Sequence, residues 1–305
     1  MTPLVLVGIG KIARDQHIPA LAASHDFEMV AAVSRNASVD GVRNFADLGA
    51  ALAALEGRHA VSLCTPPDVR TDMVLAALAA GHDVMVEKPP AASLGEVRAM
   101  EAAAERAGRT LFFSWHSRRA PGVAPAKAWL QGRSVRAATI TWHESVRQWH
   151  PGQDWVFEPG GFGVFDPGIN ALSILTAILP GPHLVTAAEM VVPEGRATPI
   201  SAELSLRSGG VPVAMSLDWL AEGEPLWRIE VETDGGTLRL DEGGARLSVD
   251  GEAMAAEGLG EYPGLYADFA ALLREGRSDT DARPLRVVAD AMLRGRAVRG
   301  APFAF

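Results

Sequence analysis

Glu87-Lys88-Pro89-Pro90 is the first stretch of the chain whose residue types and position point to chemistry. It directly follows a short apolar run at residues 83–86 that is typical of a β-strand. Side chains at the carboxyl end of such a strand lie where open α/β sheets bind their ligands. A lysine ammonium at that edge can stabilise a substrate alkoxide while a hydride leaves. We therefore interpret Lys88 as a catalytic residue rather than a solvated surface charge.

Asp166 and Asn170 form a second candidate pair. They are four residues apart at the start of an apolar stretch, residues 169–179, that predicts a buried helix. Side chains with this spacing share one helix face and can hold the same polyol. Asp166 could also cap this helix, with Pro167 in its first turn, and the two roles are compatible.

A glycine-rich turn, Gly8-Ile9-Gly10-Lys11-Ile12-Ala13, follows an apolar run near the start of the sequence and precedes a helical pattern. In a dinucleotide-binding fold the first glycine of GxGxxA allows a tight turn, and the second lets the main chain approach a pyrophosphate. The small last residue lets the helix pack closely on the strand, and the helix N-terminus faces the phosphates. Within a βαβ unit, the motif predicts a dinucleotide cofactor.

The end of the second strand is expected to select the cofactor. NAD-specific proteins normally carry an acidic residue there for the ribose 2′-hydroxyl, whereas this chain has Ser34 and Arg35. A hydroxyl and a cation suit a 2′-phosphate, so we predict NADP, with NAD as the less favoured alternative. The residues expected around the cofactor are Gly8, Gly10, Lys11, Ile12, Ser34, Arg35, Thr65, Pro66, Glu87 and Lys88.

The first 118 residues alternate short apolar runs with alanine-rich helical stretches. Strands are expected at residues 4–7, 29–33, 60–64, 83–86 and 110–113. Helices are expected at residues 11–23, 47–55, 69–80 and 94–107, with Gly81 and Gly108 as C-terminal stops. This repeated βαβ pattern predicts an α/β chain with an N-terminal Rossmann domain over residues 1–118.

Residues 119–305 have a different pattern, in which apolar and polar residues alternate strictly, as at 204–207, 213–218 and 229–232. Glycine-containing steps at 208–210, 234–236, 243–244 and 250–251 are expected to reverse the chain between such runs. We predict a C-terminal α+β domain over 119–305 with a large open, mostly antiparallel sheet. Two late helices, at 265–275 and 285–298, are expected to cover it, and the last helix is the candidate for packing back on the first domain.

The composition excludes several functional classes. Lys and Arg number 28 against 37 Asp and Glu, which leaves a net charge of −9 and no basic stripe for nucleic acid. The single cysteine, Cys64, permits no internal disulfide, and we interpret it as a small buried residue. The spacing of His116, His143, His150 and Asp166 is not that of zinc ligands, so we expect no metal. The sequence has no evident secretion signal or membrane span, which predicts a cytoplasmic protein.

Essentially the whole chain resembles the Gfo/Idh/MocA oxidoreductases, whose signature is a dinucleotide fold, then Glu-Lys-Pro, then a mixed α/β substrate domain. Residues 8–17, 114–118, 149–153 and 163–172 resemble the branch that acts on C1 of L-arabinose and D-galactose. The resemblance implies that Lys88 and Asp166 are catalytic and that Ser34 and Arg35 accompany NADP. It also implies that six residues surround the sugar: His116, Glu144, Trp149, His150, Asn170 and Trp227. Many relatives have histidine in place of Asn170, so the usual Asp–His proton relay is absent and proton transfer falls on Lys88, Asp166 or both.

The implied reaction transfers a hydride from C1 of a cyclic aldose to NADP⁺ and leaves an aldonolactone. L-Arabinopyranose and D-galactopyranose share their hydroxyl configuration, so a site that recognises those hydroxyls is expected to accept both. One alternative is a family member that acts on another polyol, cyclitol or aldose; another is a non-catalytic, NADP-binding regulatory protein. Relatives often pair through the open sheet, so a homodimer or larger homo-oligomer is expected.

Overall fold

The computed structural model describes all 305 residues and divides into two compact units. Unit 1 consists of Met1–His116 together with Leu259–Ala282, and unit 2 consists of Ser117–Gly258 together with Arg283–Phe305. The first unit therefore ends close to the expected boundary at residue 118. The segment that returns to it is the helix near residue 270, however, and the last helix belongs to unit 2.

Unit 1 contains a six-stranded parallel sheet in the order β3-β2-β1-β4-β5-β6, which is the strand order of a Rossmann fold. Its strands are β1 (Thr2–Val7), β2 (Phe27–Val33), β3 (Arg43–Phe45), β4 (Ala60–Leu63), β5 (Asp83–Glu87) and β6 (Leu111–Ser114). Its helices are α1 (Ile18–Ala22), α2 (Leu48–Ala54), α3 (Pro67–Ala79), α4 (Leu94–Ala107) and α8 (Glu261–Glu275), and a π-helical turn, Ala13–His17, precedes α1. The predicted fold class is confirmed, and only the three-residue edge strand β3 is too short for its pattern to be recognised.

Local residue choices set the helix ends in unit 1. Asp47 accepts a hydrogen bond from the main-chain nitrogen of Ala50, which caps α2. Ser93 caps α4 in the same way, and that helix ends at Gly108 in the left-handed conformation, as the sequence predicts.

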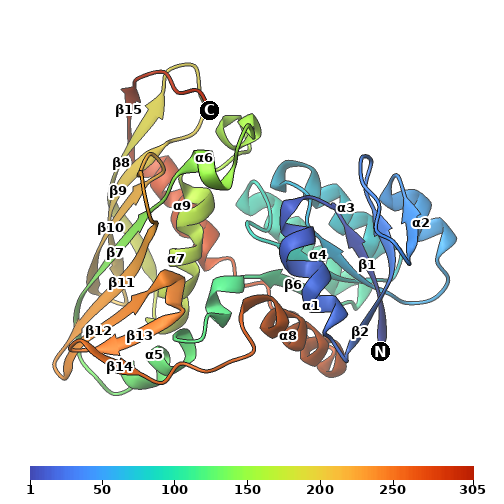
Figure 1. Cartoon of the computed structure of the whole chain (residues 1–305), viewed down its shortest axis with the longest axis horizontal. Coiled ribbons are helices and arrows are strands. Elements are labelled where there is room, and N and C mark those ends of the chain that lie inside the picture. The colour runs from blue at the N-terminus through green and yellow to red at the C-terminus, as the bar shows by residue number, and fades with distance from the viewer. The chain divides into compact units, whose positions relative to one another are not determined.

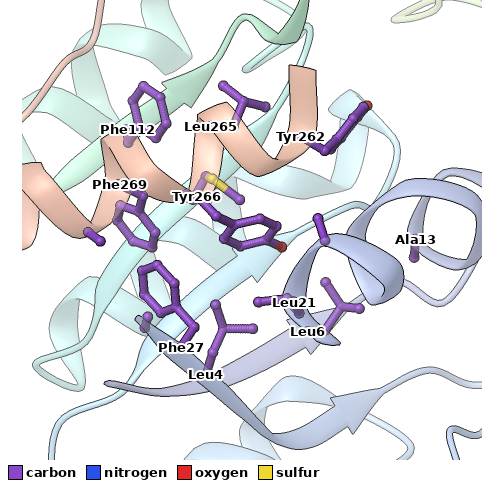
Figure 2. Close-up of a cluster of buried hydrophobic side chains, with 14 of the residues drawn as sticks. Leu4, Leu6, Ala13, Leu21, Phe27, Phe112, Tyr262, Leu265, Tyr266 and Phe269 are labelled. Carbon is purple, nitrogen blue, oxygen red and sulfur yellow. The ribbon is translucent and has the colours of Figure 1, made fainter. Parts of the chain in front are cut away.

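The core of unit 1 joins the start of the chain to α8, although more than 200 residues separate them in sequence (Figure 2). Leu4 and Leu6 from β1 and Phe27 from β2 are buried with Tyr266 and Phe269 of α8. The rings of Phe27 and Phe269 stack with centroids 5.6 Å apart. Because full burial of one large apolar side chain contributes about 2 kcal/mol, α8 is an integral part of this unit.

Unit 2 contains a nine-stranded sheet in the order β14-β13-β12-β11-β7-β10-β9-β8-β15. Its strands are β7 (Val135–His143), β8 (His183–Pro193), β9 (Ser201–Ser208), β10 (Val211–Asp218), β11 (Leu226–Thr233), β12 (Gly236–Asp241), β13 (Arg246–Val249), β14 (Glu252–Met254) and β15 (Arg296–Gly300). All neighbouring pairs are antiparallel except β7 with β10 and β8 with β15. The expected reversals are confirmed between β9 and β10, β11 and β12, β12 and β13, and β13 and β14.

The helices of unit 2 are α5 (Val123–Leu130), α6 (Val146–Trp149), α7 (Phe165–Ile178) and α9 (Arg283–Arg294). Figure 1 shows α7 and α9 on the same side of the sheet, and the two helices contact each other. The prediction of a helix over residues 285–298 is wrong beyond Arg294. A Cβ at Gly295 would lie 2.7 Å from Met190 Cε, and the chain after this glycine pairs with the edge of β8 as β15. No helix of either unit is long and apolar enough to cross a membrane.

Candidate functional site

The glycine-rich turn of unit 1 has the geometry that a dinucleotide requires. Gly8 has a φ of +88°, and a Cβ there would lie 2.9 Å from the main-chain nitrogen of Thr65, so only glycine fits. At Gly10 the space that a Cβ would occupy has no atom within 4 Å. A pyrophosphate could therefore approach the main chain at Gly10, next to the start of the helix. The residues present fit a dinucleotide cofactor.

The other residues expected around the cofactor lie at neighbouring strand ends. Lys11 and Ile12 directly precede the π-helical turn and are exposed, and the Lys11 ammonium pairs with Asp15. Ser34 and Arg35 follow β2; the Ser34 hydroxyl accepts a hydrogen bond from the main chain of residue 36, and Arg35 is exposed. Thr65 and Pro66 follow β4. No acidic side chain occupies the position where NAD-specific folds hold the ribose.

The main chain around Lys88 is fixed on both sides. Arg70 of α3 is buried, and its guanidinium donates to the carbonyl oxygens of Glu87 and Pro89. The Glu87 carboxylate accepts a hydrogen bond from the main-chain nitrogen of Lys88, at 2.8 Å. These contacts position Lys88 at the end of β5 without using its ammonium group.

A buried network extends from Glu87 into the core. The imidazole of His17, in the π-helical turn, lies 3.1 Å from the Glu87 carboxylate and 2.8 Å from the hydroxyl of Tyr266 on α8. Burial raises the pKa of the Glu87 carboxyl, but the hydrogen bond and charge of His17 outweigh it and lower that pKa to about 2. Burial lowers the pKa of His17, but its polar neighbours, among them Tyr266 and Glu87, raise it well above 6.5. Both shifts favour the charged forms of Glu87 and His17, next to the main chain of Lys88.

The Glu87 carboxylate should make the fold sensitive to acid. The pKa of this carboxyl is about 2 in the folded protein and 4.5 when solvated. Its ionised form therefore stabilises the fold above pH 4.5, and this contribution is lost as the pH falls toward 2. A shift of this size corresponds to roughly 3 kcal/mol. We expect the unfolding free energy from urea titrations between pH 7 and pH 3 to fall more steeply for the wild type than for Glu87→Gln.

A matched control for this measurement is Glu105→Gln, which changes an exposed carboxylate on α4. That variant should keep the steep decline of the wild type. Identical slopes for the wild type and Glu87→Gln would mean that the buried carboxylate does not stabilise the fold.

His116, the last residue of the first segment of unit 1, is also held by α8. Its Nδ1 lies 2.9 Å from the carboxylate of Glu261, and its ring stacks on Tyr262 with centroids 5.3 Å apart. Burial lowers the pKa of His116, but the carboxylates of Glu261 and Glu87 raise it above its ordinary value. An imidazolium in this position can donate a hydrogen bond to an oxygen-rich ligand.

Asp166 is a buried residue in the first turn of α7 in unit 2. The alternative expectation that it caps this helix is wrong, because α7 begins at Phe165 and Val164 is the capping residue. One oxygen of the Asp166 carboxylate instead lies 3.3 Å from Nε2 of His150. Asn170 lies one turn further along the same helix and is half-buried.

His150 directly follows α6, and its main-chain nitrogen donates to the carbonyl of Val146 at 2.8 Å. Its Nδ1 lies 3.3 Å from the side-chain oxygen of Gln153. The imidazole edge packs against the ring of Trp219, at a centroid distance of 5.3 Å. The imidazole therefore contacts Asp166, Gln153 and Trp219.

Glu144 links this pair to an aromatic cluster. Its buried carboxylate accepts hydrogen bonds from the indole nitrogens of Trp227, at 2.7 Å, and Trp219, at 3.2 Å. Trp227 lies against Trp142 and Trp149, with centroid distances of 5.9 Å and 5.5 Å. The indole nitrogen of Trp149 is buried and has no hydrogen-bond partner. Carboxylates beside flat apolar rings suit a ligand with polar edges and apolar faces, such as a sugar.

The predicted site residues therefore form two groups. Unit 1 contains all the residues expected around the cofactor, together with His116. Unit 2 brings Glu144, Trp149, His150, Asp166 and Trp227 into one connected cluster, with Asn170 on the adjacent turn of α7. The two catalytic candidates, Lys88 and Asp166, belong to different units, so their meeting at one substrate stays a prediction.

Sequence reasoning missed several residues of these clusters: His17, Arg70, Gln153, Trp219, Glu261, Tyr262 and Tyr266. For His17 a signal was available, because it is the only histidine in the helix that follows the glycine-rich turn. The partners on α8 are more than 140 residues from the side chains that they hold, so spacing carries no signal for them. No group of three or more His, Cys, Asp or Glu side chains is arranged to hold a metal ion.

Comparison with known proteins gives a consistent result for the whole chain. Residues 3–114 match the model of the Gfo/Idh/MocA family, an oxidoreductase family with an NAD-binding Rossmann fold. The chain is 43% identical to a galactose 1-dehydrogenase from Pseudomonas fluorescens, over 97% of this chain and 96% of that protein. The crystal structure of a D-galactose-1-dehydrogenase from Rhizobium etli superposes with a TM-score of 0.94 at 46% identity, covering 99% and 98% of the two chains. A 3-ketoreductase from Actinomadura kijaniata, solved with NADP and TDP-benzene, shares the fold at 16% identity, with a TM-score of 0.84 and coverage of 98% and 99%.

Proposed function

This chain belongs to the Gfo/Idh/MocA oxidoreductase family, and from that premise we propose that it is an NADP-dependent aldose 1-dehydrogenase that oxidises D-galactose and L-arabinose. The observation that carries the proposal is the 43% identity to a galactose 1-dehydrogenase over nearly the whole length of both chains. The cluster in unit 2 supports a sugar substrate, because it combines carboxylates with flat aromatic rings.

In the proposed reaction, C1 of the pyranose loses a hydride and its hydroxyl loses a proton, so that C1 and its oxygen form the carbonyl of an aldonolactone. Bound NADP⁺ supplies the acceptor for the hydride. The ammonium of Lys88 stabilises the negative charge that develops on the C1 oxygen. Asp166 accepts the hydroxyl proton. Glu144 and Asn170 orient the remaining hydroxyls, and the faces of Trp149 and Trp227 pack against the ring.

A panel of sugars tests the substrate. We expect reduction of NADP⁺, followed by absorbance, with both D-galactose and L-arabinose, because these pyranoses differ by one hydroxymethyl group. D-Xylose, which differs from L-arabinose in the configuration of one hydroxyl, should react much more slowly. Activity only with another polyol or cyclitol would assign a different substrate. Tight NADP binding without turnover of any sugar would favour a regulatory protein.

Arg35→Ala tests the cofactor preference. We expect kcat/KM for NADP⁺ to fall by about 10-fold to 100-fold, since a guanidinium–phosphate contact contributes roughly 1.5–3 kcal/mol. Because NAD⁺ lacks the 2′-phosphate, its kcat/KM should be unchanged. The control variant is Arg106→Ala, which removes an exposed guanidinium in the last turn of α4. Equal efficiency of Arg35→Ala and the wild type with NADP⁺ would remove Arg35 from cofactor selection.

A further inference from the structure

We propose that the pair of His150 and Asp166, rather than Asp166 alone, receives the proton of the sugar C1 hydroxyl and that the two side chains then share this one proton. The inference rests on the proposed function and adds to it the group that acts through Asp166. It is carried by the contacts of the His150 imidazole with Asp166 and Gln153, both of which lie within unit 2.

The two side chains are close and shielded. Nε2 of His150 lies 3.3 Å from Oδ2 of Asp166, and their side chains are 19% and 6% exposed. Asp166 is fixed by the first turn of α7, and His150 is fixed by the turn that follows α6. At this distance a proton can pass between the imidazole nitrogen and the carboxylate oxygen.

Gln153 determines which imidazole nitrogen carries the permanent hydrogen. The indole nitrogen of Trp155 lies 3.1 Å from the Gln153 side chain, and because an indole N–H can only donate, it faces the carbonyl oxygen. The same oxygen lies 3.3 Å from Nδ1 of His150 and can only accept. Nδ1 is therefore the protonated nitrogen, which leaves Nε2, on the Asp166 side, as the atom that gains and loses a proton.

The surroundings of the imidazole contain no second acid in contact with it. The ring packs against Trp155 and Trp219, and the Glu144 carboxylate accepts a hydrogen bond from the indole nitrogen of Trp219. Asp154 and Glu158, the acidic residues that follow His150 in the sequence, pair elsewhere. Arg196 pairs with Asp154 at 2.6 Å and with Glu158 at 3.7 Å. Arg147 donates to the carbonyl of Ala304. Asp166 is thus the carboxylate with which His150 exchanges its proton.

The proton step follows from this arrangement. As the C1–H bond breaks and its electron pair leaves with the hydride, the C1 hydroxyl proton passes to Asp166. The Nε2 lone pair of His150 then takes that proton, so the carboxylate returns to its charged form and the imidazole becomes an imidazolium. Asn170, one turn beyond Asp166, has an amide side chain that cannot take up a proton. His150 therefore supplies from the α6 loop the proton-holding group that α7 lacks.

Nitrogen NMR of the protein without sugar tests the shared proton directly. In protein labelled with ¹⁵N-histidine, with the signals assigned through His150→Gln, Nδ1 should stay protonated across the titration while Nε2 gains and loses its proton. In Asp166→Asn the midpoint for Nε2 should shift to lower pH, because the carboxylate that favours the imidazolium is gone. The proposal would be overturned if Nδ1 lost its proton before Nε2, or if Asp166→Asn left the midpoint for Nε2 unchanged.

Kinetics test whether the proton takes part in turnover. His150→Gln keeps a hydrogen-bonding side chain but cannot store a proton, so kcat should fall by about 100-fold while KM for the sugar changes little. The pH dependence of kcat in His150→Gln should also differ from that of the wild type. Added imidazole should restore part of the activity of His150→Ala. Trp155→Phe, which removes the donor that orients Gln153, should move the pH profile in the same direction.

His143→Gln is the matched control, because His143 is a histidine of the same unit that bonds to Ser216 and lies outside the cluster. It should leave kcat and its pH dependence unchanged. A raised KM with normal kcat in His150→Gln would make His150 a sugar-binding residue only and overturn the proton role. An inactive wild type that shows the expected NMR pattern would overturn the substrate assignment instead, since the titration requires no sugar.

Discussion

Lys88→Ala is expected to lower kcat by about 1,000-fold while the dissociation constant for NADP stays within a few-fold of the wild type. The physical reason is that Arg70 and Glu87 fix the main chain around residue 88, so the variant removes the ammonium and leaves its support. The hydride would then leave without a positive charge beside the C1 oxygen. Steady-state kinetics with the preferred sugar and fluorescence titration with NADPH measure the two quantities.

Two further variants sharpen this experiment. Lys88→Arg keeps the positive charge but spreads it over a larger planar group, so most of the activity should still be lost. Lys127→Ala removes the ammonium of an exposed lysine on α5 and should leave turnover unchanged. Wild-type kcat in Lys88→Ala would exclude Lys88 from the reaction.

Asp166→Asn is expected to have the second large effect, a loss of about 1,000-fold or more in kcat. The amide occupies the same volume in the first turn of α7 and can still bond to His150, so the fold should keep its melting temperature within a few degrees. What the variant lacks is a group that accepts the hydroxyl proton. Turnover at saturating sugar and thermal unfolding separate the chemical effect from a structural one.

Asp154→Asn is the control for this variant, because Asp154 is an exposed aspartate of the same unit that pairs with Arg196. Its kcat should match that of the wild type. If Asp166→Asn retained full activity, the proton acceptor would have to be sought elsewhere, with Lys88 and His150 as the remaining candidates.

Lys88 and Asp166 can serve one reaction only if both reach the same carbon. Because they belong to different units, a structure with NADP and sugar bound is the decisive observation. In it we expect the Lys88 ammonium and the Asp166 carboxylate both within hydrogen-bonding distance of the C1 oxygen. Separation of either group from C1 would remove the basis of the mechanism.

The sequence predicted those features that local patterns determine. The glycine-rich turn, the alternating strands and the glycine reversals all follow from main-chain geometry within a few residues, and the structure confirms them. The helix over residues 94–107 has exactly matching bounds because Ser93 and Gly108 mark both of its ends.

What the sequence did not predict depends on contacts between distant segments. The run at 296–300 has no strand pattern of its own and becomes β15 only because β8 offers an edge to pair with. Within the site, Glu144 and His150 were identified together with their partners Trp227 and Asp166, but their other partners, Trp219 and Gln153, were not. Trp219 is bonded to Glu144 from 75 positions away, and no spacing rule connects them.

The return of α8 to unit 1 has a consequence for how the protein can be made. The nucleotide-binding unit is incomplete until Tyr262, Tyr266 and Phe269 are available to close its core. A ribosome must therefore release almost the entire polypeptide before this unit can finish folding, although its sheet is encoded in the first 114 residues. During synthesis from the N-terminus, the sheet therefore lacks α8, and the apolar face that α8 later covers is exposed. Chaperones can bind such a face.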